Sequence, residues 1–433
     1  MIRQLGISDI QHYYMSGGEN TAFDSWSRIE LCEPLDRDAL SWAVGQALHN
    51  FPELAYRPVL HEATVWAAPN EAKVPLLEDD GSQRYYGTDE TAGYMFAVLC
   101  RADGFSLSQF HGLSDFGGIW RFTRTILYYY AIKRGLRVEP EEGIRTSADA
   151  AWAMDELERY DPYRKFCTGA ATTPAEQKDP FNIPEPLFAH TEDCCVEHTI
   201  TCPLDQFLQA SKRLNTSVAP LLTWAVSNAL TKVYDTGGLP ILTMLPTNIR
   251  STFGTQTLSN FDYPLTMAYD ADIQRLPTDQ QASALRQQIK SQMTMEHYLP
   301  HLSSKVQRFE GILKSGTAIT EWNRRFGQPL PPGVKMPFTL PLTYPGSMTL
   351  SEGYAPLVRC ITRHAYVRLG LSFGMLASTY GNTIYINSCQ RFESDAIMQQ
   401  LRDTLQQAGI PATLTSSGRF KGNKANCEKF LTV

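Results

Sequence analysis

The stretch FHGLSDFGG, Phe110–Gly118, marks the part of the sequence that decides the fold. The segment before it, 94–109, predicts a β-hairpin: an apolar strand, a two-residue turn at Asp103-Gly104, and an alternating strand that ends at His111. After it, apolar residues recur at helical spacing over 117–134. The predicted unit is therefore a hairpin, a tight loop and a helix, with His111 at the end of a strand.

Two other segments of the chain are predicted to contain the same elements in the same order: a strand, a Pro-Leu-Asp turn and an amphipathic helix. They are SRIELCEPLDRDALSWAVGQAL (27–48) and VEHTITCPLDQFLQASKRL (196–214). Between them, TTPAEQKDPFNIPEPLF (172–188) contains four prolines, which favour an extended connector. We place a lobe boundary there, with an N-terminal lobe at 1–175 and a C-terminal lobe at 176–433 that is interpreted as a diverged copy.

The chain length and the mixture of elements indicate the fold class. With 433 residues, the chain exceeds the roughly 250–300 residues at which single hydrophobic cores stop growing. Strands and helices alternate irregularly and hairpins occur among them, which disfavours a doubly wound dinucleotide fold. The prediction is an α/β protein with two lobes that contain mixed sheets.

Composition excludes several classes of partner. The formal net charge is −6, and Lys and Arg are scattered, so no nucleic acid partner is expected. No signal-type apolar core and no run of about 18 apolar residues occurs, so we expect no membrane contact and a cytoplasmic location. The nine cysteines are dispersed and never form Cys-x-x-Cys, which argues against a disulfide framework and a structural zinc site.

The imidazole of His111 and the carboxylate of Asp115 are the candidate reactive groups in the opening stretch. A His–Asp pair at such a turn could hold one tautomer and one ring orientation; the alternative is a hydrogen-bonded core histidine. A Gly-x-Ser-x-Gly nucleophile elbow around Ser114 fails because Phe116 stands where glycine is required. The Asp-Phe-Gly triplet matches a kinase motif by chance, since no His-Arg-Asp loop precedes it.

A second histidine pair, His297 and His301, has the spacing of two metal ligands on one helical turn. Pro300 is expected to interrupt that helix, and no third ligand suggests itself. The sequence therefore predicts no metal site.

The opening stretch resembles the His-x-x-x-Asp-Gly motif of the chloramphenicol acetyltransferase and condensation-domain superfamily, with Phe116 inserted before the glycine. Other segments resemble the same superfamily. Leu35–Val59 is similar to its first helix and strand, and Gly87–Gly118 looks like its bacterial alcohol-acetyltransferase-like branch. Leu245–Leu265 and Thr339–Leu350 resemble stretches of its second lobe near the tunnel.

The resemblance implies two chloramphenicol-acetyltransferase-like lobes in a V, with the active site in a central tunnel. It implies that an acyl group moves from a thioester, on coenzyme A or on the phosphopantetheine arm of a carrier protein, to a hydroxyl or amine of a small-molecule acceptor. These donors are substrates, and no tightly bound cofactor is expected. Natural-product biosynthesis is the implied setting.

The resemblance also implies roles for particular residues. His111 becomes the general base, which suits an imidazole because its unperturbed pKa is roughly 6.5. Asp115 becomes a structural residue that pairs with Arg250. The remaining expected positions are the loop glycines Gly117 and Gly118 and the tunnel or lobe-interface residues Arg250, Asn260 and Thr343.

Three functions stay open at this point. The first is a coenzyme A-dependent acyltransferase acting on a small molecule. The second is a stand-alone condensation enzyme of the nonribosomal-peptide type, which joins carrier-bound units through an amide or ester. The third is a binding protein that retains the fold without catalysis.

Overall fold

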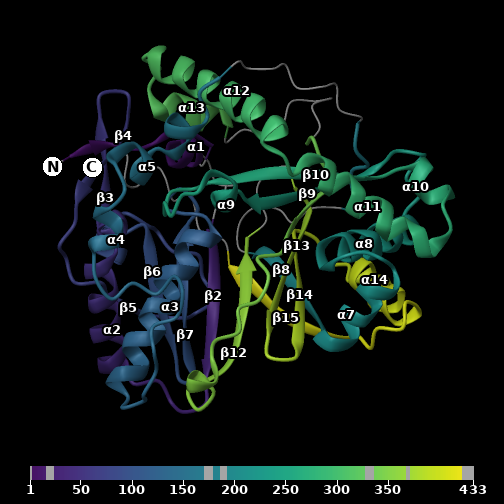
Figure 1. Cartoon of the computed structure of the whole chain (residues 1–433), viewed down its shortest axis with the longest axis horizontal. Helices are drawn as coiled ribbons and strands as arrows, with labels where there is room; N and C mark the ends of the chain where they lie inside the picture. Colours follow the sequence, from purple (N-terminus) through teal and green to yellow (C-terminus); the bar gives the residue numbers. More distant parts are fainter. Residues whose placement is uncertain are drawn as a thin grey trace.

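The computed structural model describes residues 2–15, 24–169, 179–185, 193–326, 336–366 and 371–421. Over these residues the chain forms three β-sheets, of which the two larger ones lie side by side with helices packed outside them (Figure 1). Each of the larger sheets contains both parallel and antiparallel neighbours. The predicted α/β class with mixed sheets is confirmed.

The first large sheet has five strands in the order β12-β2-β7-β6-β5. Its strands are β2 (Asp24–Leu31), β5 (Leu76–Glu78), β6 (Phe96–Arg101), β7 (Gly104–Phe110) and β12 (Val358–Ala365). The helices α2 (Arg37–Asn50) and α3 (Phe116–Lys133) pack against each other beside it (Figure 1). Asp36 caps α2, because its Oδ1 accepts a hydrogen bond of 2.9 Å from the amide of Ala39.

One strand of this sheet comes from the second half of the chain. Strand β12 pairs antiparallel with β2, placing Arg363 opposite Ser27 and Ala365 opposite Ser25. It also packs against β13 and β14 of the other large sheet, so the two halves of the chain are joined through it. The predicted lobe boundary between 175 and 176 falls outside the described residues and stays a prediction.

The second large sheet has seven strands in the order β10-β9-β11-β13-β14-β8-β15. Its strands are β8 (Asp193–Pro203), β9 (Ile241–Asn248), β10 (Asp262–Tyr269), β11 (Leu340–Thr343), β13 (Phe373–Tyr380), β14 (Thr383–Gln390) and β15 (Thr413–Lys421). The helices that pack on it and on one another are α7 (Leu204–Arg213), α8 (Val218–Val233), α11 (Thr278–Gln292) and α14 (Ala396–Gln407) (Figure 1).

A three-stranded sheet and shorter helices complete the described structure. The sheet consists of β1 (Arg3–Gln4), β3 (Tyr56–His61) and β4 (Thr64–Pro69). The other helices are α1 (Ile7–Met15), α4 (Asp149–Trp152), α5 (Glu156–Tyr160), α6 (Pro162–Phe166), α9 (Arg250–Phe253), α10 (Ala271–Arg275), α12 (Met295–Lys314) and α13 (Ile319–Phe326). Helix α1 packs against α12 and α13. No helix in the described ranges has the length and apolar character needed to cross a membrane.

Local predictions were wrong at two places. The two-residue hairpin turn is Ala102-Asp103, because Arg101 pairs with Gly104. Glycine is required at position 104, since a Cβ there would lie 2.1 Å from the carbonyl oxygen of Ile29. Pro300 does not interrupt its helix but lies inside α12, whose first turn is capped by Thr294. The sequence also predicts a strand at 366–372, and residues 367–370 of that segment lie outside the described residues.

Candidate active site

A cavity of about 600 Å³ lies between the two halves of the chain. His111 and Phe116 line it from the first half, whereas Asp262, Thr343 and Arg363 line it from the second. Strand β12 brings Arg363 into this wall, although the residue is far from His111 in the sequence. The cavity therefore occupies the place where the tunnel was predicted.

His111 follows β7 directly and lies in the turn that leads into α3. Its half-buried ring stacks on the ring of His12 from α1, with centroids 4.4 Å apart and planes inclined by 15°. Its backbone carbonyl accepts a hydrogen bond of 2.9 Å from the side-chain amide of Asn260. The buried Nδ1 has no hydrogen-bond partner among the described residues. The ring is thus oriented by stacking and by its backbone.

Asp115 does not form the His–Asp pair that the spacing allowed. Its Oδ1 caps α3 by accepting from the amide of Gly118 at 3.0 Å. Its Oδ2 accepts from Nη1 of Arg250 and from the amide of Phe261, both at 2.8 Å. Burial alone would raise the pKa of Asp115, but the charge and hydrogen bonds of Arg250 and the two amides hold it below its usual range.

The ion pair expected between Asp115 and Arg250 is confirmed, and it joins the two halves of the chain. The other guanidinium nitrogens of Arg250 donate to the carbonyls of Thr257 and Ser259, each at 2.7 Å. Both side chains are more than nine-tenths buried. Such a pair is stable when its hydrogen bonds are satisfied, as they are here.

Asn260 extends this network to α1. Oδ1 of Asp9 accepts hydrogen bonds from the backbone amide and the side-chain amide of Asn260, at 3.0 and 2.9 Å. Burial raises the pKa of Asp9 to about 7, although the bonds from Asn260 act in the opposite direction. We call Asp9, Asp115, Arg250 and Asn260 the inter-lobe hub.

An added Cβ would meet close neighbours at both loop glycines, and the clash would be severe at Gly118. A Cβ on Gly118 would lie 2.1 Å from Oγ of Ser114, and a Cβ on Gly117 would lie 3.0 Å from Nη1 of Arg250. The inserted Phe116 opens α3 and lines the cavity.

The predicted site residues fall into two groups. Those that line the cavity are His111, Asp115, Gly117 and Thr343. Those that lie behind it are Gly118, Arg250 and Asn260. The structure brings all of them into one region, and their roles in catalysis remain predictions.

Sequence reasoning missed a carboxylate in the cavity wall, Asp262, which opens β10. Burial raises its pKa, and the charge of Asp115 acts in the same direction. The hydroxyl of Tyr163 donates to the backbone carbonyl of Asp262 at 2.9 Å and accepts from Nζ of Lys305 at 3.3 Å. Burial lowers the pKa of Lys305 to about 8. The available signal was its place directly after Asn260 and Phe261, within the stretch Leu245–Leu265.

His12 and Arg363 were also missed, because each reaches the site from a distant element. His12 lies on α1 and Arg363 on β12, and neither belongs to a motif with recognisable spacing. The packing of α1 near the loop places His12 beside His111, and the pairing of β12 with β2 brings Arg363 into the wall of the same cavity.

The second histidine pair forms local contacts instead of a metal site. Nδ1 of His301 lies 2.8 Å from the carbonyl oxygen of His297, whose Nε2 lies 3.3 Å from the hydroxyl of Tyr263. Over the described ranges, no group of three or more His, Cys, Asp or Glu side chains is arranged to hold a metal ion.

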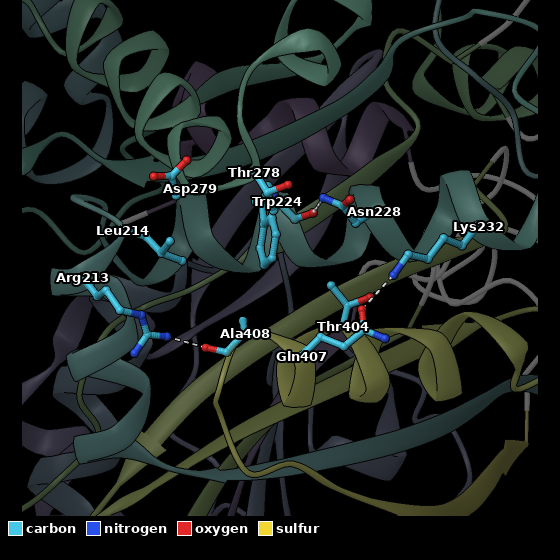
Figure 2. A pocket seen from close by; sticks show the side chains of 10 residues that line it. All are labelled: Arg213, Leu214, Trp224, Asn228, Lys232, Thr278, Asp279, Thr404, Gln407 and Ala408. Atoms are coloured by element: carbon cyan, nitrogen blue, oxygen red, sulfur yellow. Dashed lines mark hydrogen bonds between the residues drawn. The ribbon is translucent and has the colours of Figure 1, made fainter.

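Another pocket, of about 450 Å³, lies among α7, α8, α11 and α14 (Figure 2). Figure 2 shows that the two basic side chains of this pocket, Lys232 and Arg213, point at neighbouring groups. Nζ of Lys232 donates to Oε1 of Gln407 at 3.2 Å, and Nη2 of Arg213 donates to the backbone carbonyl of Ala408. Its ten lining residues include no histidine or cysteine. The cavity at His111 is therefore the candidate active site.

Among the comparisons with known proteins, only the comparison with solved structures found matches. No family model matches the sequence, and no curated protein matches it. The chain is similar to TRI101 of F. sporotrichioides, solved with coenzyme A and T-2, with a TM-score of 0.59 at 12% identity, covering 96% of this chain and 100% of that one.

Two further solved structures are similar to this chain over nearly its whole length. The trichothecene 15-O-acetyltransferase TRI3 of Fusarium sporotrichioides has a TM-score of 0.55 at 10% identity, covering 94% of each chain. The condensation domain of the monacolin K polyketide synthase MokA has a TM-score of 0.58 at 11% identity, covering 94% of this chain and 96% of that one. The chain therefore shares the fold of these acetyltransferase and condensation-domain structures.

Proposed function

We propose that this chain is an acyltransferase that moves an acyl group from a thioester to a hydroxyl or amine, with His111 as general base. The observation that carries the proposal is the position of His111 in a cavity lined by both halves of the chain. Acetyltransferases and condensation domains share the fold, which supports acyl transfer as the reaction class.

The residues at the site fit such a reaction. His111 would accept the proton of the acceptor hydroxyl or amine as its oxygen or nitrogen attacks the thioester carbonyl. As the tetrahedral intermediate collapses, the C–S bond breaks and the imidazolium returns the proton to the departing thiolate. General base catalysis of this kind contributes about 10²–10⁴-fold. The stacking of His111 on His12 would limit rotation of the ring during both proton transfers.

We propose coenzyme A thioesters as donors and a small molecule as acceptor. Similarity to TRI101, whose structure contains coenzyme A, supports this choice. Similarity to the MokA condensation domain supports the second candidate, in which a carrier protein presents the acyl group on its phosphopantetheine arm. A cytoplasmic location remains a proposal from the sequence.

The test is thiol release from acetyl-coenzyme A and longer acyl-coenzyme A donors with a panel of alcohols and amines. Acceptor-dependent release should fall at least about a hundredfold in His111→Ala. His49→Ala, on the exposed side of α2, is the matched control and should keep the wild-type rate.

Each other outcome has a defined meaning. Unchanged release in folded His111→Ala would show that His111 is not the base. Release only from an acyl-loaded carrier protein would establish the condensation enzyme. No release from either donor would favour the binding protein.

A further inference from the structure

Arg363 is a buried cation in the cavity wall that has no carboxylate partner among the described residues. Its relative exposure is 3%, and it lines the same cavity as His111. Within the described ranges, its guanidinium donates to two hydroxyls, Oγ of Ser25 at 2.6 Å and Oγ of Ser27 at 3.2 Å. Burial lowers its pKa to about 9, so it remains charged at neutral pH.

The pairing of three strands directs Arg363 towards the His111 side of the sheet. Residues paired across neighbouring strands share a face, and Arg363 pairs with Ser27, which pairs with Leu107. His111 lies four residues beyond Leu107 and so continues the same alternation just past the end of β7. Strand β12 lies two strands from β7, a separation of about 10 Å.

Phe116 completes this wall. The guanidinium of Arg363 lies 4.9 Å from the centroid of the Phe116 ring, which stacks in turn on Trp120 at 6.0 Å. A charged group held over an apolar ring has few water molecules to neutralise it, and an uncompensated buried charge is unfavourable. Phe116, which interrupts the His-x-x-x-Asp-Gly pattern, is therefore the residue whose ring packs against the guanidinium of Arg363.

The other charged groups of the cavity do not neutralise Arg363. Asp115 is paired with Arg250, and Arg124 is paired with Glu141. Arg121 adds further positive charge, its Nη1 donating to the carbonyl of Gln256 at 2.9 Å. Glu142 and Asp262 also line the cavity, and neither forms an ion pair with Arg363.

We propose that Arg363, with Ser25 and Phe116, binds a carboxylate carried by the substrate close to its reacting group. This inference rests on the proposed function, because it names the substrate class of the same site. The carboxylate belongs either to a hydroxy-acid or amino-acid acceptor or to a dicarboxylic acyl group. The phosphates of coenzyme A are not this anion, since the whole pantetheine arm separates them from the thioester.

Two matched ligand pairs distinguish the two sources by isothermal titration calorimetry at pH 7. The first pair is 3-phenylpropionate and 3-phenylpropionamide, which test an acceptor carboxylate. The second pair is glutaryl-coenzyme A and pentanoyl-coenzyme A, which test an acyl carboxylate. In one of the two pairs, the ligand that carries the carboxylate should bind at least about tenfold more tightly than its neutral counterpart, because hydrogen bonds between charged groups are stronger than those between neutral groups. The pair that shows this preference identifies the source of the carboxylate.

Variants assign that preference to Arg363. Arg363→Gln should abolish it, whereas Arg359→Gln should keep it, because Arg359 lies on the same strand but pairs with Glu30 and Asp103 at the surface. If Arg363→Gln does not fold, Arg363→Lys replaces it and should reduce the preference, since lysine lacks the planar fork of donors.

The proposal is overturned if wild type shows no preference in either pair, or if the preference persists in Arg363→Gln or is undiminished in Arg363→Lys. His111→Ala should keep the preference, since binding requires no turnover. If the wild-type protein shows the preference but transfers no acyl group from either kind of donor, the proposed function is contradicted and the carboxylate site still stands.

Discussion

Two buried arginines lie beside the same cavity and differ in what surrounds them. Arg250 bonds the carboxylate of Asp115, two backbone carbonyls and the side chain of Asn248. In the part of the chain that the structure describes, Arg363 donates hydrogen bonds to two serine hydroxyls and to no carboxylate. Both side chains are about equally inaccessible to solvent. Burial alone therefore does not reveal the role of a charged residue, whereas its partners do.

The difference separates a structural cation from one that is available to a ligand. Arg250 has its hydrogen bonds satisfied and joins the loop after β7 to the second half of the chain. Arg363 retains a positive charge that no described carboxylate offsets. A bound anion would complete its environment in the way that Asp115 completes that of Arg250.

The largest expected effect is on stability when the inter-lobe hub is broken. Arg250→Met leaves the carboxylate of Asp115 buried without its counter-charge, which should lower the free energy of unfolding by about 3–5 kcal/mol. Urea denaturation followed by circular dichroism measures the change. Arg275→Met is the matched control, because its pair with Asp272 is exposed and should contribute at most about 1 kcal/mol. A loss as small as that of the control would remove the distinction between the two arginines.

A smaller effect is expected from Asp9, at the other end of the hub. Its pKa of about 7 in the folded state exceeds the ordinary value of 3.8. Between these values the folded state binds the extra proton, so the stability contributed by Asp9 falls as pH rises from about 4 to about 7. Asp9→Asn keeps the acceptor for Asn260 but does not titrate.

The measurement is the free energy of unfolding of both proteins at pH 5 and pH 8. The free energy of unfolding of Asp9→Asn minus that of wild type should increase from pH 5 to pH 8 by at least about 1.4 kcal/mol, which is the equivalent of one pKa unit. Asp38→Asn, at an exposed position of α2, should show no such change. A pH-independent difference would indicate that Asp9 is ionised throughout.

The smallest effect is expected at Arg363. Arg363→Met removes a buried charge that lacks a counter-ion, and the gain offsets the two lost hydrogen bonds. The free energy of unfolding should change by less than about 1 kcal/mol in the same denaturation experiment. A loss comparable to that of Arg250→Met would mean that Arg363 is structural, and the contrast between the two arginines would disappear.

The local elements around the opening stretch could be predicted because their signals are local. Hairpin, loop and helix follow from alternation, turn residues and helical spacing, and α3 begins within one residue of the predicted start. The partner of Asp115 could be predicted only through the resemblance, since spacing alone favoured a pair with His111. Within the inter-lobe hub, the carboxylate of Asp115 pairs with the guanidinium of Arg250. A charged guanidinium is a stronger hydrogen-bond partner for a carboxylate than a neutral imidazole is.

By itself, the sequence determined the fold class and the position of His111 at a strand end. These follow from short-range patterns and from a motif within nine residues. Only the tertiary structure decided that His12 stacks on His111, that Asp262 and Arg363 line the same cavity, and that Phe116 supports a buried cation. These contacts depend on strand order and on packing between segments that are far apart in the sequence, and such pairing leaves no periodic signal in one chain.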